Sequence, residues 1–208
     1  MRRVSIALLC GLFATYGTTA LAVDFSNGVY WGVNAGIAVE EDTCTKIEVA
    51  PGFSEQAGCD NTDFSWQLYL GYQFNKWFSV EGGFVDLGGS EFRVFQTSLT
   101  TKSRGWTLGG AITLPLLERA GIYAIGGAYF WDREGIVDVV GNVPIKSSDR
   151  GTDYYWGGAL RYPFSEKVGI SIEYKSFVDV GDSTISTGDY YDGTTDYAVY
   201  SAGLNFRF

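Results

Sequence analysis

The chain of 208 residues contains no histidine, and it has only 1 Met, 3 Cys and 4 Pro. Without imidazole it can build neither a Ser-His-Asp triad nor a His-ligated zinc or haem site. Beyond its first residues it has no hydrophobic stretch that approaches the roughly 20 residues of a transmembrane helix. Histidine-dependent enzymes and proteins with membrane-spanning helices are therefore excluded, whereas chemistry by carboxylates alone stays open.

Residues 1–22 are typical of a secretory signal peptide. Two arginines follow the initial Met, an apolar run covers residues 4–13, and Ala20-Leu21-Ala22 provides the small-x-small pattern for cleavage. We therefore expect the mature chain to begin at Val23, with residues 23–208 forming a single domain. Without the signal the net charge falls from −9 to −11, because two arginines and no acid are removed. We expect no nucleic-acid partner, since binding phosphates requires a basic patch.

The abundant residues favour strands. The chain has 28 Gly, about twice the ordinary usage, with 6 Trp, 14 Tyr and 14 Phe. Apolar and polar residues alternate most clearly over 64–74, a pattern typical of a β-strand. Segments of this kind predict eight strands, at 29–38, 64–74, 78–87, 106–114, 121–131, 154–164, 168–178 and 197–208.

The connections between these segments alternate in length. The short ones cover 75–77, 115–120 and 165–167, and the long ones cover 39–63, 88–105, 132–153 and 179–196. An even number of strands of about ten residues with such connections is typical of a membrane barrel, and a β-sandwich gives no reason for it. The expected fold class is all-β, an eight-stranded antiparallel up-and-down transmembrane β-barrel in the cell outer membrane.

The two faces of the strands predict different surroundings. Aromatic residues gather near both strand ends, as expected for outward faces at the two membrane interfaces. The opposite faces would line the lumen and carry charges, which are costly to bury unless they are paired. We therefore expect a lumenal ion network of Glu81 and Glu173 with Arg161, Lys175 and Arg207. Residues 123–131 alternate poorly, and the pattern does not assign their faces.

A short motif recurs where three of the segments end. It reads Phe84-Val85-Asp86-Leu87-Gly88, then Phe130-Trp131-Asp132, then Phe177-Val178-Asp179-Val180-Gly181. One hairpin is thus the repeated unit of a closed sheet. The recurrence of the aspartate favours a role at strand ends over catalysis, so we assign no catalytic residue.

The first long connection holds Cys44 and Cys59, the two cysteines of the mature chain. In a secreted chain such a pair most simply forms one disulfide, which would stabilise by about 3 kcal/mol. Metal or redox chemistry is the alternative. The connections 39–63 and 179–196 are acidic, and they would either hold divalent cations or form a solvated surface. We assign no metal site and no cofactor.

Two stretches carry a resemblance to a known family. Residues 68–88 closely resemble the second hairpin of OmpA-like outer-membrane barrels, and the last residues resemble the signal that the barrel assembly machinery reads, through Ser201, Gly203, Phe206 and Phe208. The resemblance covers essentially all of 23–208. It implies a salt-bridge plug in the lumen, with Glu81, Arg161 and Glu173 at matching positions. OmpA itself continues into a peptidoglycan-binding domain, and we do not carry a tether to the cell wall over to this chain.

The expected function is structural rather than enzymatic. We expect a monomeric barrel that supports envelope integrity, displays four extracellular loops, and has a lumen plugged by a polar and ionic network. The alternatives are a narrow porin-like channel for ions or small solutes, and an adhesin or receptor that acts through the loops. The expected partners are outer-membrane lipid and lipopolysaccharide, with the barrel assembly machinery and periplasmic chaperones during biogenesis.

Overall fold

The structure, a computed structural model, describes residues 27–41, 58–94, 97–116, 120–139, 144–181 and 194–208. The strands are β1 (Gly28–Glu40), β2 (Gly58–Asp60), β3 (Thr62–Gln73), β4 (Phe78–Val94), β5 (Thr97–Pro115), β6 (Gly121–Val139), β7 (Ile145–Pro163), β8 (Val168–Val180) and β9 (Thr195–Arg207). Within this part of the chain, no helix has the length and hydropathy needed to cross a membrane.

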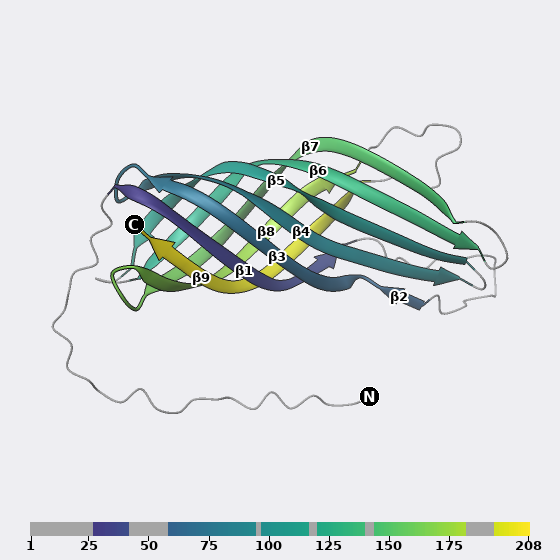
Figure 1. The fold of residues 1–208 in the computed structure, drawn as a ribbon, viewed down its shortest axis with the longest axis horizontal. Coiled ribbons are helices and arrows are strands. Elements are labelled where there is room, and N and C mark those ends of the chain that lie inside the picture. Colours follow the sequence, from purple (N-terminus) through teal and green to yellow (C-terminus); the bar gives the residue numbers. More distant parts are fainter. Residues whose placement is uncertain (1–26, 42–57, 95–96, 117–119, 140–143, 182–193) are drawn as a thin grey trace, which may run out of the picture.

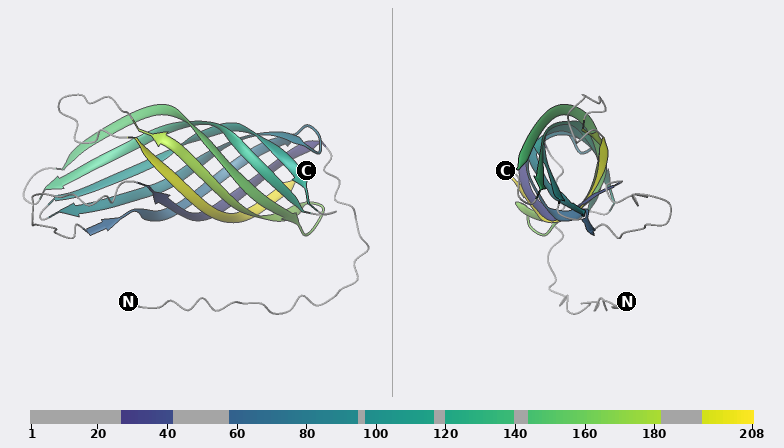
Figure 2. Two further views of the ribbon diagram at one scale, coloured as in Figure 1. Left: turned by 180° about the vertical axis from the view of Figure 1, so that it is seen from behind. Right: turned by 90° about the vertical axis from the view of Figure 1, so that its right-hand side faces the viewer.

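Eight of the strands form one closed sheet (Figures 1 and 2). Their order is β4-β3-β1-β9-β8-β7-β6-β5, and β5 pairs back with β4. Neighbouring strands are antiparallel, and the seam between β1 and β9 runs from the pair Tyr30–Arg207 to the pair Glu40–Tyr197. The short β2 pairs only with β4. The prediction of an eight-stranded antiparallel up-and-down barrel is confirmed.

The two ends of the barrel differ. The connections β3–β4 and β7–β8 are tight, and they lie at the same end as the start of β1 and the end of β9. We call this the turn end, and the opposite end, with the connections β4–β5 and β6–β7, the loop end. The strands β5, β6 and β7 have 19 residues each, whereas β1, β8 and β9 have 13. One side of the barrel therefore extends beyond the other at the loop end (Figure 1).

The prediction of long loops at 88–105 and 132–153 is wrong. Their described residues continue the strands in two paired hairpins, β4–β5 and β6–β7, with registers that run from Gly89–Lys102 to Val94–Thr97 and from Asp132–Arg150 to Val137–Ile145. Alternating hydropathy marks only the part of a strand that has one apolar face. Beyond it polar residues occur on both faces, with apolar residues scattered among them, so the regular pattern ends while the hydrogen-bonded pairing continues.

Two copies of the recurring aspartate motif coincide with β-bulges. The register shifts between Asp86 and Gly89 in β4, and between Phe177 and Val180 in β8. Gly88 and Asp179 have positive φ angles of 73° and 58°, which allow the extra residue to fit. Asp86 Oδ1 accepts a hydrogen bond of 2.9 Å from the Gly88 N–H. The third copy, at Asp132, has no shift, and β6 continues in register.

The exterior of the barrel is apolar, the reverse of a soluble protein. Its large outward side chains include Trp106, 63% exposed, and Ile172, 64% exposed. The inward residues of β6, which sequence patterning left unassigned, are Tyr123, Ile125, Tyr129 and Trp131, all buried. Because both faces of this strand are apolar or small, no alternation is visible in its sequence.

Glycines make room for inward tyrosine rings. Gly71 lies opposite Tyr30, and Gly32 lies opposite Tyr69, on the neighbouring strands β1 and β3. A Cβ atom at either glycine would overlap the ring of the tyrosine opposite. Each ring therefore lies flat over a glycine across the strand pair, a known way of covering a glycine in a sheet.

The paired glycines of β6 allow a direct test of close strand packing. A Cβ at Gly127 would overlap the Leu108 carbonyl oxygen of β5, whereas at Gly126 the nearest atom would be 3.4 Å away. We predict that Gly127→Ala lowers the free energy of unfolding by about 1–3 kcal/mol, because backbone cannot move aside. Gly126→Ala is the matched control, with a smaller effect. Urea titration of the refolded protein in lipid vesicles measures both, and equal effects would contradict the packing.

Candidate functional site

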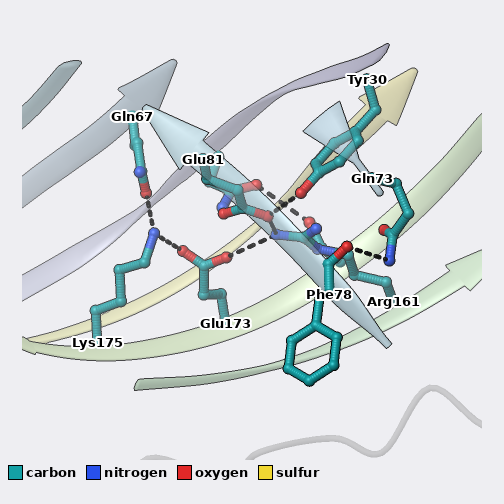
Figure 3. Close-up of polar contacts among 10 residues, drawn as sticks. Tyr30, Gln67, Gln73, Phe78, Glu81, Arg161, Glu173 and Lys175 are labelled. Atoms are coloured by element: carbon teal, nitrogen blue, oxygen red, sulfur yellow. Dashed lines mark hydrogen bonds and ion pairs between the residues drawn. The ribbon is translucent and has the colours of Figure 1, made fainter. Parts of the chain in front are cut away.

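Four charged side chains from three strands form a chain of ion pairs inside the barrel (Figure 3). Arg161 Nη2 of β7 lies 2.8 Å from Glu81 Oε1 of β4 and 3.9 Å from Glu173 Oε2 of β8. Lys175 Nζ, also on β8, lies 2.5 Å from Glu173 Oε1. We call this set the ion network. Two acids and two bases balance in charge, which offsets the cost of removing each from water.

Polar groups from β1 and β3 complete the surroundings of the ion network. The Tyr30 hydroxyl donates a hydrogen bond of 2.6 Å to Glu81 Oε1, and Lys175 Nζ donates one of 2.8 Å to Gln67 Oε1. All six side chains of this assembly are buried. Five strands are thus joined across the lumen, so the network holds opposite walls of the barrel together.

Tyrosine rings surround the Arg161 guanidinium. Its Cζ lies 4.3 Å from the ring centre of Tyr123, 5.2 Å from that of Tyr69 and 5.5 Å from that of Tyr30. Aromatic faces attract a cation, and the attraction is stronger where water is excluded. Sequence analysis placed Arg161 in the lumen but did not predict these rings. The signal was present, because Tyr69 occupies the otherwise polar face of segment 64–74.

A second layer, apolar and aromatic, lies on the loop-end side of the ion network. The Phe177 ring centre lies 4.7 Å from that of Tyr129 and 5.6 Å from that of Tyr155. Buried aliphatic side chains complete what we call the aromatic layer, namely Val85, Leu87 and Val180. Lys175 Nζ lies 5.7 Å from the Tyr155 ring centre, where the two layers meet. Sequence analysis missed this layer, because it assigned the apolar residues to the outward faces.

A further ion pair joins opposite walls beyond the aromatic layer. Arg133 Nη2 of β6 lies 3.2 Å from Glu40 Oε1 at the end of β1, and Arg133 Nη1 donates a hydrogen bond to the Val180 carbonyl oxygen of β8. The Glu40 side chain is 3% exposed. Three strands thus meet through one guanidinium at the loop end.

Arg207, the fifth residue of the expected network, lies at the turn end. It lines a cavity of about 50 Å³ together with Lys167, Asn205, Tyr30 and Arg161. The volume would hold only a few water molecules. This cavity therefore reaches Arg161 of the ion network from the turn end, but it is far too small for a solute.

The residues of the expected assembly signal lie on the closing strand. Phe206 stacks on Trp31 across the seam, with ring centres 4.5 Å apart and an interplanar angle of 17°. Ser201 lies opposite Gly36, and Gly203 lies opposite Asn34. Phe208 is 81% exposed.

Other sequence expectations lie outside the described residues. These include the signal peptide over 1–22 and Cys44. The backbone of Cys59 lies in β2, opposite Phe92 of β4, and its side chain is also outside the description. Within the described ranges, no three potential metal ligands of the Asp, Glu, His or Cys type form a group.

A family model described as the OmpA-like transmembrane domain matches residues 25–208. The chain belongs to this family. The resemblance that the sequence suggested is therefore confirmed, and the outward apolar face is that of a transmembrane barrel.

Solved structures show the same fold. Ail, the attachment invasion locus protein of Yersinia pestis, is 17% identical over 88% of this chain and 97% of that one, with a TM-score of 0.50. Neisserial surface protein A is 15% identical over 87% of this chain and 97% of that one, with a TM-score of 0.54. Comparison with curated proteins finds no match.

Removal of Arg161 tests how much the ion network stabilises the barrel. We predict that Arg161→Ala lowers the free energy of unfolding by about 3–5 kcal/mol, because Glu81 and Glu173 remain buried without this partner. Arg104→Ala is the control, since its pair with Glu134 is about half exposed and should contribute less than about 1 kcal/mol. Urea unfolding in lipid vesicles, followed by tryptophan fluorescence, measures both. A similar loss for the two variants would contradict the role of the network.

Proposed function

We propose that this OmpA-like barrel is a structural protein of the bacterial outer membrane that supports the envelope and displays its loops outside the cell. The apolar exterior and the family support this placement. Tight turns face the periplasm in such barrels and longer connections face outward. The turn end would therefore lie in the periplasm and the loop end outside.

The filled lumen is the observation that carries the proposal. The ion network together with Tyr30 and Gln67 joins five strands, and the aromatic layer lies next to it on the loop-end side. The interior of an eight-stranded barrel is narrow enough for side chains to fill it. Ion pairs and stacked rings within it would favour rigidity over conduction, which supports a scaffold over the porin-like alternative.

Two of the three aspartates that carboxylate chemistry would need, Asp86 and Asp132, have structural partners for their carboxylates. Asp86 accepts from the Gly88 N–H in a bulge, and Asp132 Oδ2 lies 3.0 Å from Arg150 Nε. Asp179 takes part in the other bulge through its backbone N–H, which donates to Asp196 Oδ1. These contacts support strand-end roles and a non-enzymatic protein.

Biogenesis completes the proposal. Residues 1–22 would direct export and be removed, and periplasmic chaperones would deliver the chain to the barrel assembly machinery. The signal of Ser201, Gly203, Phe206 and Phe208 would be read there. The Phe206 ring on Trp31 supports this, because the last strand must find β1 to close the sheet. We further propose a Cys44–Cys59 disulfide outside the cell and a monomeric barrel.

Attachment to other surfaces is a second candidate function. It is supported by the β4–β5 and β6–β7 hairpins, which extend beyond the other strands at the loop end. Ail of Yersinia pestis, named for attachment and invasion, has also been crystallised with a heparin analogue. At 16% identity this likeness concerns the fold, so the candidate depends on the hairpins themselves.

Conductance distinguishes the scaffold from the channel. We predict no channel steps for the wild-type protein in planar bilayers, because both lumenal layers block the path. The double variant Tyr155→Ala/Phe177→Ala removes the aromatic layer, and a gel-mobility check shows whether it still forms a heat-modifiable barrel. Channel steps in this variant would show that the aromatic layer is needed to block the lumen. A silent variant would show that the ion network blocks the lumen alone. Reproducible wild-type steps that change size in Arg161→Ala would contradict the proposal and support a pore.

Shortening one hairpin tests the attachment candidate. We predict that replacing residues 135–147 of the β6–β7 hairpin with a two-residue Asp-Gly turn, which joins the register partners Glu134 and Ser148, reduces binding of expressing cells to host cells, if this hairpin makes the contact. The turn keeps the strand pairing below it. The same cells should retain equal amounts of heat-modifiable barrel. Unchanged adhesion would exclude this hairpin as the adhesive element.

A further inference from the structure

A row of aromatic side chains on the outside of the barrel marks a level near the loop end. Phe84, Trp106 and Phe130 are register partners on β4, β5 and β6. The ring centres of Phe84 and Trp106 are 5.3 Å apart, and Trp106 is 63% exposed. In membrane barrels such rows lie at the interface where hydrocarbon meets head groups. Side chains one step further out would therefore lie among the head groups.

The next outward row consists of alternating charges. Register pairing joins Asp86 to Arg104, Arg104 to Asp132, and Asp132 to Arg150 across β4, β5, β6 and β7. The row beyond it pairs Lys102 with Glu134. We call these outward side chains the charged wall.

The ion pairs of the charged wall are exposed. Arg104 Nη2 lies 3.1 Å from Glu134 Oε1, and these side chains are 54% and 48% exposed. Arg150 Nε lies 3.0 Å from Asp132 Oδ2, with the Arg150 side chain 82% exposed. Exposed pairs of this kind contribute little to stability. Both guanidinium groups can therefore exchange a carboxylate for another anion at small cost.

The opposite side of the loop end differs in charge. On β1, β3, β8 and β9, the described residues at that end include no exposed Lys or Arg. Acids are present there instead, including Glu41 and Asp63, both exposed. Among the side chains that the structure describes, the outward cations of the loop end thus lie on β5 and β7.

We propose that the charged wall binds the phosphate groups of an outer-leaflet glycolipid, lipopolysaccharide, through Arg104, Arg150 and Lys102. Guanidinium groups form paired hydrogen bonds with phosphate oxygens. The apolar surface directly below, with Trp106 and Leu108 exposed, would hold the acyl chains of the same molecule. Asp132 and Glu134 keep the cations from repelling one another, and carboxylates suit the divalent cations that accompany such phosphates.

The arrangement favours a lipid over a soluble polyanion. An amphiphile needs phosphate ligands next to an exposed apolar surface, and the wall provides both in adjacent rows of the same strands. A soluble sulfated glycan would need only cations, and the alternating acids would weaken its binding. This inference depends on the proposed location in the outer membrane.

Binding of purified lipid A to the mature protein in phosphatidylcholine nanodiscs tests the proposal, with native mass spectrometry to count bound molecules. We expect Arg104→Gln/Arg150→Gln to bind phosphorylated lipid A about tenfold more weakly than wild type, because two charge-assisted contacts are lost. The control Lys76→Gln/Lys167→Gln removes the same charge from exposed positions at the turn end and should bind as wild type. Dephosphorylated lipid A should not distinguish the variants.

Three outcomes would overturn the proposal. The first is that both double variants bind phosphorylated lipid A equally well. The second is that the wild-type protein binds phosphorylated and dephosphorylated lipid A equally well. The third is that Arg104→Gln/Arg150→Gln loses binding to a soluble heparin fragment while its binding to lipid A is unchanged. The last would assign the wall to a free polyanion. Failure of the wild-type protein to form a heat-modifiable barrel in bilayers would instead overturn the proposed function. A well-inserted barrel without phosphate preference would overturn only the present inference.

Discussion

Closure of the sheet is the constraint from which the remaining features follow. A bilayer offers no partner for a free backbone N–H or carbonyl, so a spanning sheet must satisfy every such group itself. The pairing of β1 with β9 does this over eleven register positions, from Tyr30 to Glu40. Closing with only eight strands leaves a narrow interior that side chains must fill. Each inward side chain therefore needs a contact inside the barrel, which is an oppositely charged side chain, an aromatic ring, or the backbone of a glycine on a neighbouring strand.

The interior meets this need in layers with different chemistry. Near the turn end, the ion network and its tyrosine rings pair every buried charge with an opposite charge or an aromatic face. Toward the loop end, Phe177 and its neighbours exclude water by contact alone. The Glu40–Arg133 pair then joins β1 to β6 above them. With the lumen occupied in this way, the surfaces left for recognition are the exterior wall and the loop end.

The sequence predicts the fold and much of the lumen, because period-two patterning needs only one apolar face. The polar faces of the alternating strands carry four charged residues, Glu81, Arg161, Glu173 and Lys175. Because charges are costly to bury alone, their pairing in the lumen could be expected from the sequence. Two kinds of feature could not be read in this way. The hairpin extensions have polar residues on both faces, so strand pairing there leaves no alternation. The bulges shift the inward positions by one residue, from Leu87 to Ser90 in β4 and from Phe177 to Val180 in β8, which a fixed period cannot follow. The aromatic layer was missed for a related reason, since an apolar residue facing inward resembles one facing lipid.

The most direct test of the account is amide hydrogen exchange along the β1–β9 seam of the mature protein in lipid nanodiscs, followed by NMR. Closure predicts that residues 31–37 and 200–206 are protected as strongly as the continuous β5–β6 pair, because every amide of the seam is hydrogen-bonded within the sheet. Rapid exchange confined to the seam would show an open sheet with free edges. That result would contradict the closed barrel and, with it, the filled lumen.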